Sequence, residues 1–483
     1  MVHPHSHATD DARSPAPGIT TLGELRASGH RYETVKEELR RNLLTRLRSG
    51  EQRFPGIVGF DETVLPHLER ALLAGHDTIL LGERGQGKTR LIRTLTELLD
   101  EWSPVVTGCE INDHPYQPAC ARCRRLAGEQ GDGLPVSWRH RSERYGEKLA
   151  TPDTSVGDLI GDVDPVKVAE GRTLGDPETI HFGLVPRTNR GVFSLNELPD
   201  LAERIQVALL NVLEERDIGV RGYALRLPLD IVLIASANPE DYTNRGRIIT
   251  PLKDRFGAEI RTHYPLDLSH ELGLIRQEAE IAAWDGHDAA SQLPDHLVEI
   301  IARFTRLVRA SPAIDSRSGV SARFAIAAAE SAAASAVRRA ALTGESQPVA
   351  RVCDLPATVP TLRGKVEFEV SEEGREQEVL EHLLRRAVAD TFRARLGSAD
   401  MSGLLAPFAE GGTVESGDLV AASELLGRMG EVPGLARIMD RLGMDGGESP
   451  GEAAAAVEFA LEGLYLMRRL SKDVVGGSSV YRT

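Results

Sequence analysis

The sequence lacks any uninterrupted run of about 18 apolar residues, the minimum expected of a membrane-spanning helix. Its N-terminal segment is polar and lacks the apolar stretch of a signal peptide. Cysteine is scarce, with 4 residues in 483, too few for a disulfide framework in a chain of this length. We therefore expect a cytoplasmic protein that does not insert into a membrane.

Positive charge is also in deficit. Lys and Arg number 57 against 72 Asp and Glu, which leaves a formal net charge of −15. This balance argues against nucleic acid or an anionic membrane surface as the main partner. The hydrophobic fraction of 41% is sufficient for a packed core, and the length suggests about three domains at ~150 residues each.

One octapeptide carries more functional information than the rest of the chain. Residues 82–89 read GERGQGKT and fit the pattern G-x-x-x-x-G-K-[ST]. An apolar, strand-like run, Thr78–Leu81, precedes the motif, and apolar residues at helical spacing follow it from 91 to 99. A glycine-rich turn that matched the pattern by chance would have no reason to lie between a strand and a helix. The sequence therefore predicts a phosphate-binding loop at this position.

Each residue type in the motif has a physical role in this prediction. Gly82, Gly85 and Gly87 allow backbone N–H groups to close around phosphate oxygens at the start of a helix. Lys88 is expected to reach the β- and γ-phosphates of ATP, and the hydroxyl of Thr89 is expected to bind Mg²⁺. The predicted cofactors are therefore ATP and Mg²⁺.

Hydrolysis of ATP also needs a carboxylate that orients water near the γ-phosphate. Glu197 follows the apolar run 192–195 and fits that role, while Asn196 stands where an aspartate is usual. An asparagine keeps an acceptor oxygen for a metal-bound water but removes a negative charge, which predicts weaker metal binding. Asn238 follows the apolar run 231–235, where a polar side chain can hold the lytic water.

Two arginines are further candidates. Arg255, in the segment PLKDRFG, is placed where a subunit edge could insert a guanidinium into a neighbouring subunit's site. Arg323 lies in a predicted lid helix and could contact the γ-phosphate. The competing interpretation of either residue is a solvated or salt-bridged surface arginine.

The chain divides into four segments by pattern. Residues 1–50 are expected to form a disordered tail and a leading helix from about 32 to 48. Residues 51–265 alternate strand-like and helical runs, which predicts an α/β domain with a parallel sheet and helices on both faces. Residues 266–347 are alanine-rich and indicate a helical lid. Residues 348–483 indicate a mostly helical C-terminal domain, with one exposed strand at 365–370.

The order of these motifs resembles that of the AAA+ ATPases. The segments GIVGFDETVLPHLERALLAGHDTILLGERGQGKT, FGLVPRTNRGVFSLNEL, QVALLNVLEERDIGVRG and LIASANPEDYTNRGRIITPLKDRFG are similar to the ATPase subunit of magnesium chelatase and, somewhat less, to the MoxR-like ATPases. The resemblance covers about residues 54–330. It implies an AAA+ P-loop core with a helical lid.

The same resemblance implies an ATP-hydrolysing ring, typically a hexamer. It also implies hairpins near 159–185 and 218–227, and a partner that carries a von Willebrand factor A domain. Two other functions remain open: a nucleotide-gated scaffold in which Asn196 makes turnover negligible, and an enhancer-dependent transcription activator. Activators of that kind carry a GAFTGA loop and a helix-turn-helix segment, and the sequence shows neither.

A cluster of metal-binding residue types lies outside these motifs. Cys109, His114, Cys120 and Cys123 fall within fifteen residues and end in a C-x-x-C pair. Such a set could close a tetrahedral structural Zn²⁺ site. Ordinary or redox-responsive thiols are the alternative. The region also resembles a cysteine-containing insertion in the chelatase subunit.

Overall fold

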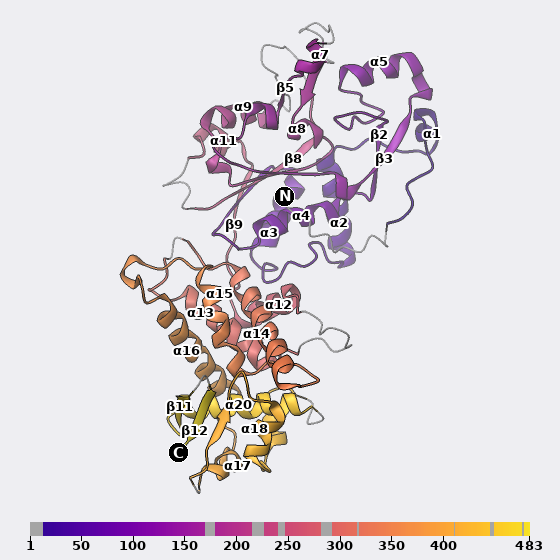
Figure 1. Ribbon diagram of the computed structural model, residues 1–483. Coiled ribbons are helices and arrows are strands. Elements are labelled where there is room, and N and C mark those ends of the chain that lie inside the picture. The colour runs from indigo at the N-terminus through magenta and orange to yellow at the C-terminus, as the bar shows by residue number, and fades with distance from the viewer. Residues whose placement is uncertain are drawn as a thin grey trace. The chain divides into compact units, whose positions relative to one another are not determined.

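The computed structural model describes residues 13–169, 179–214, 227–239, 247–281, 292–315, 318–409, 411–444, 449–475 and 478–483. The chain forms two compact units (Figure 1). The first comprises Met1–Gly82 and Gly87–Thr262, and the second comprises Glu83–Gln86 and His263–Thr483. Among the described residues, no helix is long and apolar enough to cross a membrane.

A five-stranded parallel sheet forms the centre of the first unit. Its strands are β1 (Thr78–Leu81), β4 (Tyr145–Leu149), β7 (Gly191–Asn196), β8 (Ile231–Ala237) and β9 (Ala258–Arg261). Their order across the sheet is β4-β7-β8-β1-β9, and all four pairings are parallel. The predicted parallel sheet is therefore confirmed. The strand that precedes the phosphate loop, β1, has the predicted bounds.

The topology places a ligand site at one end of β1. The chain leaves β1 for the distant edge strand β4, returns through β7 and β8, and then crosses to β9 on the other side of β1. Thr78 consequently pairs with Ile234 on one side and with Ala258 on the other. In open parallel sheets, ligands bind outside the carboxyl ends of the strands at such a switch point.

Helices cover both faces of this sheet because the sheet residues alternate between two apolar clusters. Val232 and Ile234 face the cluster that contains α2 (Val35–Ser49), α3 (Val64–Ala74) and α4 (Lys88–Thr94). The intervening Leu233 and Ala235 face the opposite cluster. That second cluster contains apolar residues of α9 (Glu203–Glu214) and α11 (Thr250–Arg255). The predicted leading helix is α2, which begins with a capping box at Thr34.

Two smaller antiparallel strand pairs accompany the sheet. Strands β2 (Trp102–Val106) and β3 (Val136–His140) pair antiparallel, and the long connection between them contains the helix α5 (Ala121–Gln130). Strands β5 (Gly161–Val163) and β6 (Ile180–Phe182) form the second antiparallel pair, within the range where the resemblance implies a hairpin. Residues 170–178, between β5 and β6, and the second implied hairpin, up to residue 226, lie outside the described residues.

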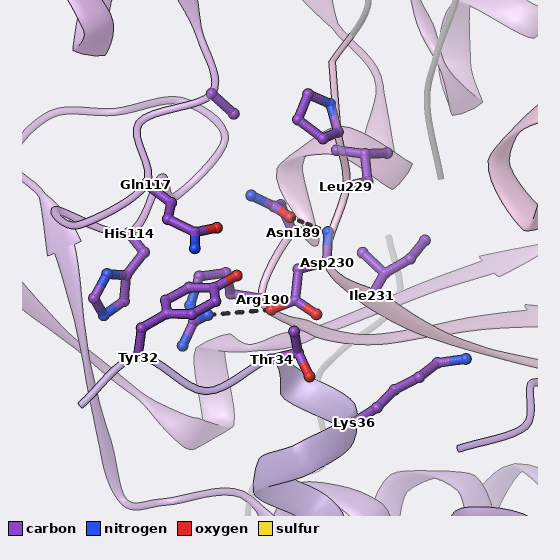
Figure 2. A pocket seen from close by; sticks show the side chains of 12 residues that line it. Tyr32, Thr34, Lys36, His114, Gln117, Asn189, Arg190, Leu229, Asp230 and Ile231 are labelled. Atoms are coloured by element: carbon purple, nitrogen blue, oxygen red, sulfur yellow. Dashed lines mark hydrogen bonds and ion pairs between the residues drawn. The ribbon is translucent and has the colours of Figure 1, made fainter. Parts of the chain in front are cut away.

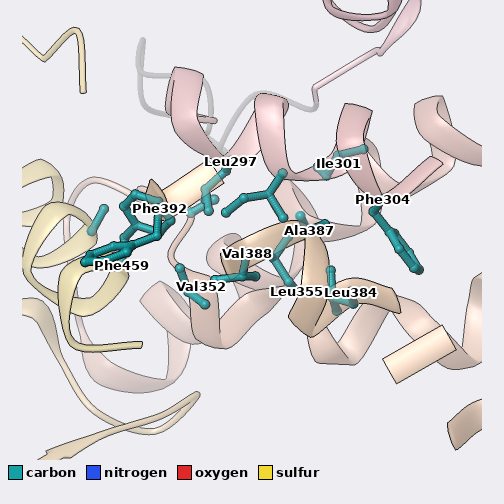
Figure 3. Close-up of a cluster of buried hydrophobic side chains, with 14 of the residues drawn as sticks. Leu297, Ile301, Phe304, Val352, Leu355, Leu384, Ala387, Val388, Phe392 and Phe459 are labelled. Atoms are coloured by element: carbon teal, nitrogen blue, oxygen red, sulfur yellow. The ribbon is translucent and has the colours of Figure 1, made fainter. Parts of the chain in front are cut away.

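The second unit is mostly helical, as predicted. Its longer helices are α12 (Leu268–Glu278), α13 (Asp295–Arg309), α14 (Ala322–Thr343), α16 (Glu376–Leu396) and α20 (Pro450–Leu466). One continuous apolar core runs from α12 to the C-terminal segment, and Figure 3 shows part of it. The boundary expected near residue 347 falls within this shared core.

A small antiparallel sheet completes the second unit. Strands β10 (Val414–Ser416), β12 (Ser478–Arg482) and β11 (Ser471–Val475) lie side by side in that order. The sequence did not predict this sheet. The prediction of a strand at 365–370 is wrong. Only Phe368 pairs there, in an isolated bridge with Ile314.

Candidate nucleotide-binding site

The phosphate loop joins β1 to α4 at the carboxyl end of the sheet. Gly85 and Gly87 have φ angles of +73° and +75°, in the left-handed region that favours glycine. The N–H of Gly82 donates to the carbonyl of Ala237 at 3.2 Å, which ties the start of the loop to the end of β8. Lys88 is the first residue of α4, as the motif predicts.

A chain of hydrogen bonds connects three predicted site residues. The buried ammonium of Lys88 donates to Asn238 Oδ1 at 2.9 Å and also to the carbonyl of Gly82. Asn238 Nδ2 in turn donates to Glu197 Oε2 at 2.9 Å. The residues come from α4 and from the carboxyl ends of β8 and β7. The structure therefore brings the phosphate-binding lysine and the predicted base into one connected site.

Glu197 has a backbone conformation that is uncommon outside glycine. Its φ and ψ angles are 56° and 47°, directly after the last residue of β7. Such a conformation costs about 1–3 kcal/mol and is found most often at functional sites. The turn directs the glutamate side chain toward Asn238, with which it shares a hydrogen bond. This backbone strain supports a functional interpretation of Glu197.

Asn196 has an acidic partner that the sequence did not reveal. Its Nδ2 donates to Glu147 Oε1 at 2.7 Å across the β4–β7 pairing, while its Oδ1 accepts from the Ser236 hydroxyl at 3.0 Å. The asparagine therefore removes one carboxylate from this corner but holds another against it. Glu147 therefore places a carboxylate beside position 196, and Arg93 pairs with that carboxylate at 2.8 Å.

Glu147 is a residue of this corner that none of the sequence motifs indicates. It lies on the edge strand β4, and its Oε2 accepts from Arg93 Nη2 at 2.8 Å and from the Tyr145 hydroxyl at 3.1 Å. The only sequence signal was a glutamate in the middle of the run YGEKL. Nothing in that run indicates its pairing with residue 196, because the pairing arises from the strand order.

The remaining predicted residues of the first unit lie near the same end of the sheet or on a helix. Thr89 is half-buried in the first turn of α4, next to Lys88. Arg255 is the last residue of α11, with its side chain 34% exposed and 3.4 Å from the Asp254 carboxylate. The partly exposed position of Arg255 is compatible with contact to a neighbouring subunit, which remains a prediction.

Residues 83–86, in the middle of the phosphate loop, belong to the second unit by their contacts. The N–H of Ala322 donates to the carbonyl of Gly85 at 3.4 Å, at the start of α14. A Cβ atom on Gly85 would lie only 2.1 Å from Ser321 Oγ, so this approach requires glycine. Arg323, the next residue of α14, is exposed. Its contact with the γ-phosphate remains a prediction.

A separate cavity lies at the opposite end of the sheet. It encloses about 310 Å³, and Figure 2 shows the side chains of Tyr32, His114, Arg190 and Asp230 around it. Arg190 immediately precedes β7 and Asp230 precedes β8, and their side chains form an ion pair of 3.1 Å. The cavity is thus at the amino ends of these strands, whereas the phosphate loop is at the carboxyl ends. It is not the nucleotide site.

The cysteine cluster differs from its prediction in one member. Ligand atoms of Cys109, Cys120 and Cys123 lie together, and the fourth residue of the group is Asp113. The structure thus replaces the predicted His114 with its neighbour. Burial is the main cause that raises the pKa of Asp113 to about 6, and hydrogen bonds from the other two thiols lower the pKa of Cys109.

His114 instead takes part in an aromatic cluster. Its Nε2 lies 3.2 Å from His30 Nε2, with the two rings stacked, and its Nδ1 accepts from the N–H of Tyr116 at 3.0 Å. Both ring nitrogens are therefore engaged away from the thiols. Burial lowers the pKa of His114 to about 2, so the ring is neutral at physiological pH.

A glycine-rich loop between β1 and α4, a glutamate after β7, an asparagine after β8 and the sheet order β4-β7-β8-β1-β9 define a P-loop protein with the AAA+ fold. The Sigma-54 interaction domain family matches residues 173–255, a stretch that contains Glu197, Asn238 and Arg255. The strand order and this match together support the AAA+ fold of the first unit.

Individual relatives match a longer stretch of the chain than the family model does. The magnesium-chelatase 38 kDa subunit of Acidiphilium rubrum is 31% identical over 230 residues, covering 46% of this chain and 62% of that protein. The magnesium-chelatase subunit ChlI of Nostoc sp. is 27% identical over 239 residues, covering 47% and 58%. The chain has the AAA+ fold and is similar to these magnesium-chelatase subunits over about 230 residues. It spans about three fifths of the length of these two relatives.

Solved structures are more distant. A complex between subunits BchI and BchD of magnesium chelatase matches at 22% identity, over 68% of this chain and 98% of that chain, with a TM-score of 0.35. TM-scores this low support no inference about function.

Proposed function

We propose that this protein binds ATP with Mg²⁺ and hydrolyses it as a subunit of a ring, typically a hexamer. The hydrogen-bonded chain from Lys88 through Asn238 to Glu197 is the main support. When ATP binds, the Lys88 ammonium exchanges neutral oxygens for phosphate oxygens, which are stronger acceptors for a buried cation. Glu197, connected to the same asparagine, is then positioned to orient water toward the γ-phosphate.

Magnesium fits the oxygen donors at this corner. The Thr89 hydroxyl lies beside Lys88, and carboxylate and amide oxygens of Glu197 and Asn196 come from the end of β7. Hard oxygen ligands together with phosphate are the usual environment of Mg²⁺ in nucleotide sites. Glu147 adds a negative charge next to Asn196. We assign ATP and Mg²⁺ as the cofactors on this donor set.

The ring is proposed to act on another protein or a metallocofactor assembly through a partner with a von Willebrand factor A domain. The support for this partner is the resemblance to the magnesium-chelatase ATPase subunit. The ATP-bound Glu197→Gln protein is the form to test, because it should hold the nucleotide without turnover. Light scattering should detect its ring, and co-elution should detect a partner that carries a von Willebrand factor A domain.

Two variants test ATP hydrolysis directly. Lys88→Ala should lose affinity for a fluorescent ATP analogue, because it removes the buried cation at the phosphates. Glu197→Gln should keep that affinity and release phosphate about 10²–10⁴ times more slowly. Glu203→Gln, an exposed glutamate at the start of α9, is the matched control and should behave as the unaltered protein. Normal turnover by Glu197→Gln would place the base elsewhere.

The match to the Sigma-54 interaction domain favours one second candidate, an enhancer-dependent transcription activator. The match covers the shared ATP-hydrolysis segment, and the chain lacks the GAFTGA sequence. ATP-dependent binding to the sigma-54 factor would support the activator. A nucleotide-gated scaffold is distinguished by turnover: it binds ATP but releases no phosphate.

A further inference from the structure

The loop between β2 and α5 brings three thiols and one carboxylate to a common point. One ligand atom from each of Cys109, Asp113, Cys120 and Cys123 lies within 4.8 Å of all the others. The Cys109 and Cys120 sulfurs are 4.0 Å apart, and none of the cysteines forms a disulfide. This is the donor set and the spacing of a site for one metal ion.

Backbone N–H groups are directed at the sulfur atoms. The N–H of Asp113 donates to Cys109 Sγ at 3.3 Å, and the N–H of Cys123 donates to Cys120 Sγ at 3.3 Å, where Cys120 caps α5. Hydrogen bonds of this kind stabilise the thiolate form that binds metal. Asn112 has a φ of 55°, the left-handed turn that brings Asp113 back toward Cys109.

Asp113 is the decisive member of the group. Its side chain is 1% exposed, and Oδ2 accepts from the N–H groups of Ala119 and Cys120 at 3.0 and 2.8 Å. Its Oδ1 is buried and has no hydrogen-bond partner among the described residues. An unpaired buried carboxylate oxygen is costly. A bound cation would remove that cost.

Apolar packing holds both sides of this loop. Leu22, Val106, Cys123 and Leu134 form a small buried cluster, and Ile111 belongs to the larger core of the first unit, against which Cys109 and Cys120 also pack. None of the four cysteines forms a disulfide, so the two ends of the loop have no covalent cross-link. A metal held by Cys109 at one end of the loop and by Cys120 and Cys123 at the start of α5 would supply it.

We propose that this protein binds one structural Zn²⁺ through the thiolates of Cys109, Cys120 and Cys123 and through Asp113 Oδ1. Zn²⁺ accepts sulfur and oxygen ligands in tetrahedral sites, whereas Mg²⁺ and Ca²⁺ prefer oxygen alone. Four protein ligands close the coordination shell, as in structural rather than catalytic zinc sites. His114 is not a ligand, because its ring pairs with His30.

The metal content of this chain, purified without chelator, tests the proposal. We expect one equivalent of zinc by elemental analysis, released when a mercurial reagent blocks the thiols. Cys120→Ser should lose the metal, and Cys353→Ser, the fourth cysteine outside the cluster, should retain it. Should Cys120→Ser fail to fold, thiol-coupled zinc release from the unaltered protein still decides the question. Absence of zinc in folded, zinc-supplemented protein, or a Cys109–Cys120 disulfide, would overturn the proposal.

The neighbouring pair Asp113 and His114 tests the fourth ligand. Asp113→Asn should weaken zinc affinity at least about tenfold in competition with a chromophoric chelator. His114→Gln should leave the affinity unchanged. In cobalt-substituted protein, the unaltered chain and His114→Gln should show the same tetrahedral, three-thiolate spectrum. Loss of zinc in His114→Gln with retention in Asp113→Asn would refute the assignment of Asp113. Neither result depends on whether the protein hydrolyses ATP.

Discussion

Asn196 donates a hydrogen bond of 2.7 Å to Glu147 across two neighbouring strands of the central sheet. The amide occupies the position where an aspartate is usual in this kind of site, and the acid lies on the next strand. Ser236 holds the other end of the amide. The corner therefore keeps one carboxylate, which also pairs with Arg93, and adds a donor that orients it. An aspartate at 196 would face Glu147 as a second acid.

Asn196→Asp should impair the site rather than improve it. Two unit charges of the same sign about 4 Å apart repel by about 4 kcal/mol at an effective dielectric constant of 20, and the exposure of Glu147 and its ion pair with Arg93 reduce this value. We expect a loss of about 1–3 kcal/mol in unfolding free energy at neutral pH. We also expect slower ATP turnover at every magnesium concentration, measured in a magnesium titration.

The double variant Glu147→Gln/Asn196→Asp is the matched control, since it exchanges the amide and the acid between the two positions. It should recover most of the stability and turnover lost by Asn196→Asp. Glu147→Gln alone should fold and need more magnesium for half-maximal turnover. If Asn196→Asp is as active as the unaltered protein and the double variant is not, the pairing has no functional role.

The features that sequence predicted correctly are local. The strand, loop and helix around Lys88 follow one another within about twenty residues, so their periodicity and glycines specify them directly. The strands before Glu197 and Asn238 are short, apolar and buried on both faces, which is the pattern of central parallel strands. The order of these segments was enough to place both side chains at one end of the sheet.

The missed features depend on contacts between segments distant in sequence. Glu147 meets Asn196 only because β4 pairs with β7. Asp113 replaces His114 in the cysteine cluster because His30, 84 residues away, stacks on the histidine. Such contacts leave no local pattern, so residue type alone favoured the histidine.

The trans role of Arg255 predicts a specific mixing result. Arg255→Ala should bind ATP normally and hydrolyse it about 10³–10⁵ times more slowly, because the transition-state charge loses its guanidinium. Addition of Lys88→Ala protein should restore part of the activity. In mixed rings, a site with Lys88 then faces a neighbour with Arg255. Phosphate release during titration of one protein with the other measures this recovery.

Arg261→Ala provides the control for that experiment, because Arg261 is a more exposed arginine of the same unit, with 84% of its side chain accessible. It should hydrolyse ATP normally without any partner. Absence of recovery in Arg255→Ala mixtures, despite mixed rings shown by differential tagging, would assign Arg255 to its own subunit.

Loss of one partner of a buried ion pair should destabilise the first unit. Arg144 contacts Glu38 through two hydrogen bonds of 2.7 and 2.6 Å, and both side chains are at least 96% buried. Removal of one partner leaves an uncompensated buried charge. We therefore expect Arg144→Met or Glu38→Gln to lower the unfolding free energy by about 3–5 kcal/mol. Urea denaturation followed by tryptophan fluorescence can measure this, since Trp102 and Trp138 lie in this unit.

An exposed arginine of α2 gives the comparison. Arg41 contacts Glu33 at 2.9 Å and Asp100 at 2.7 Å, with all three side chains at least 40% exposed. Arg41→Met should cost no more than about 1 kcal/mol. The double variant Glu38→Leu/Arg144→Met should be more stable than either variant that removes one charge. Equal losses of unfolding free energy at the buried and exposed sites would show that burial does not determine how much an ion pair contributes to stability.

A buried histidine should make the second unit sensitive to acid. His296 is fully buried on α13, and the centroid of its ring lies 4.8 Å from that of Phe459. Phe459 belongs to the apolar core of the second unit (Figure 3). Neither ring nitrogen has a hydrogen-bond partner among the described residues. Burial, assisted by the positive charge of Arg395, lowers the pKa of His296 from 6.5 to about 3.

Below pH 6.5 the unfolded chain therefore binds a proton at His296 that the folded chain does not bind, until the pH approaches 3. The stability that depends on this residue is fully present above pH 6.5 and declines as pH falls, by at most about 1.4 kcal/mol for each pH unit. His296→Leu should reduce that acid sensitivity and shift the midpoint of acid unfolding, followed by circular dichroism, to lower pH. His382→Leu, at an exposed position of α16, should leave the midpoint unchanged. An identical acid midpoint in His296→Leu and the unaltered protein would show that other groups determine the acid limit of this unit.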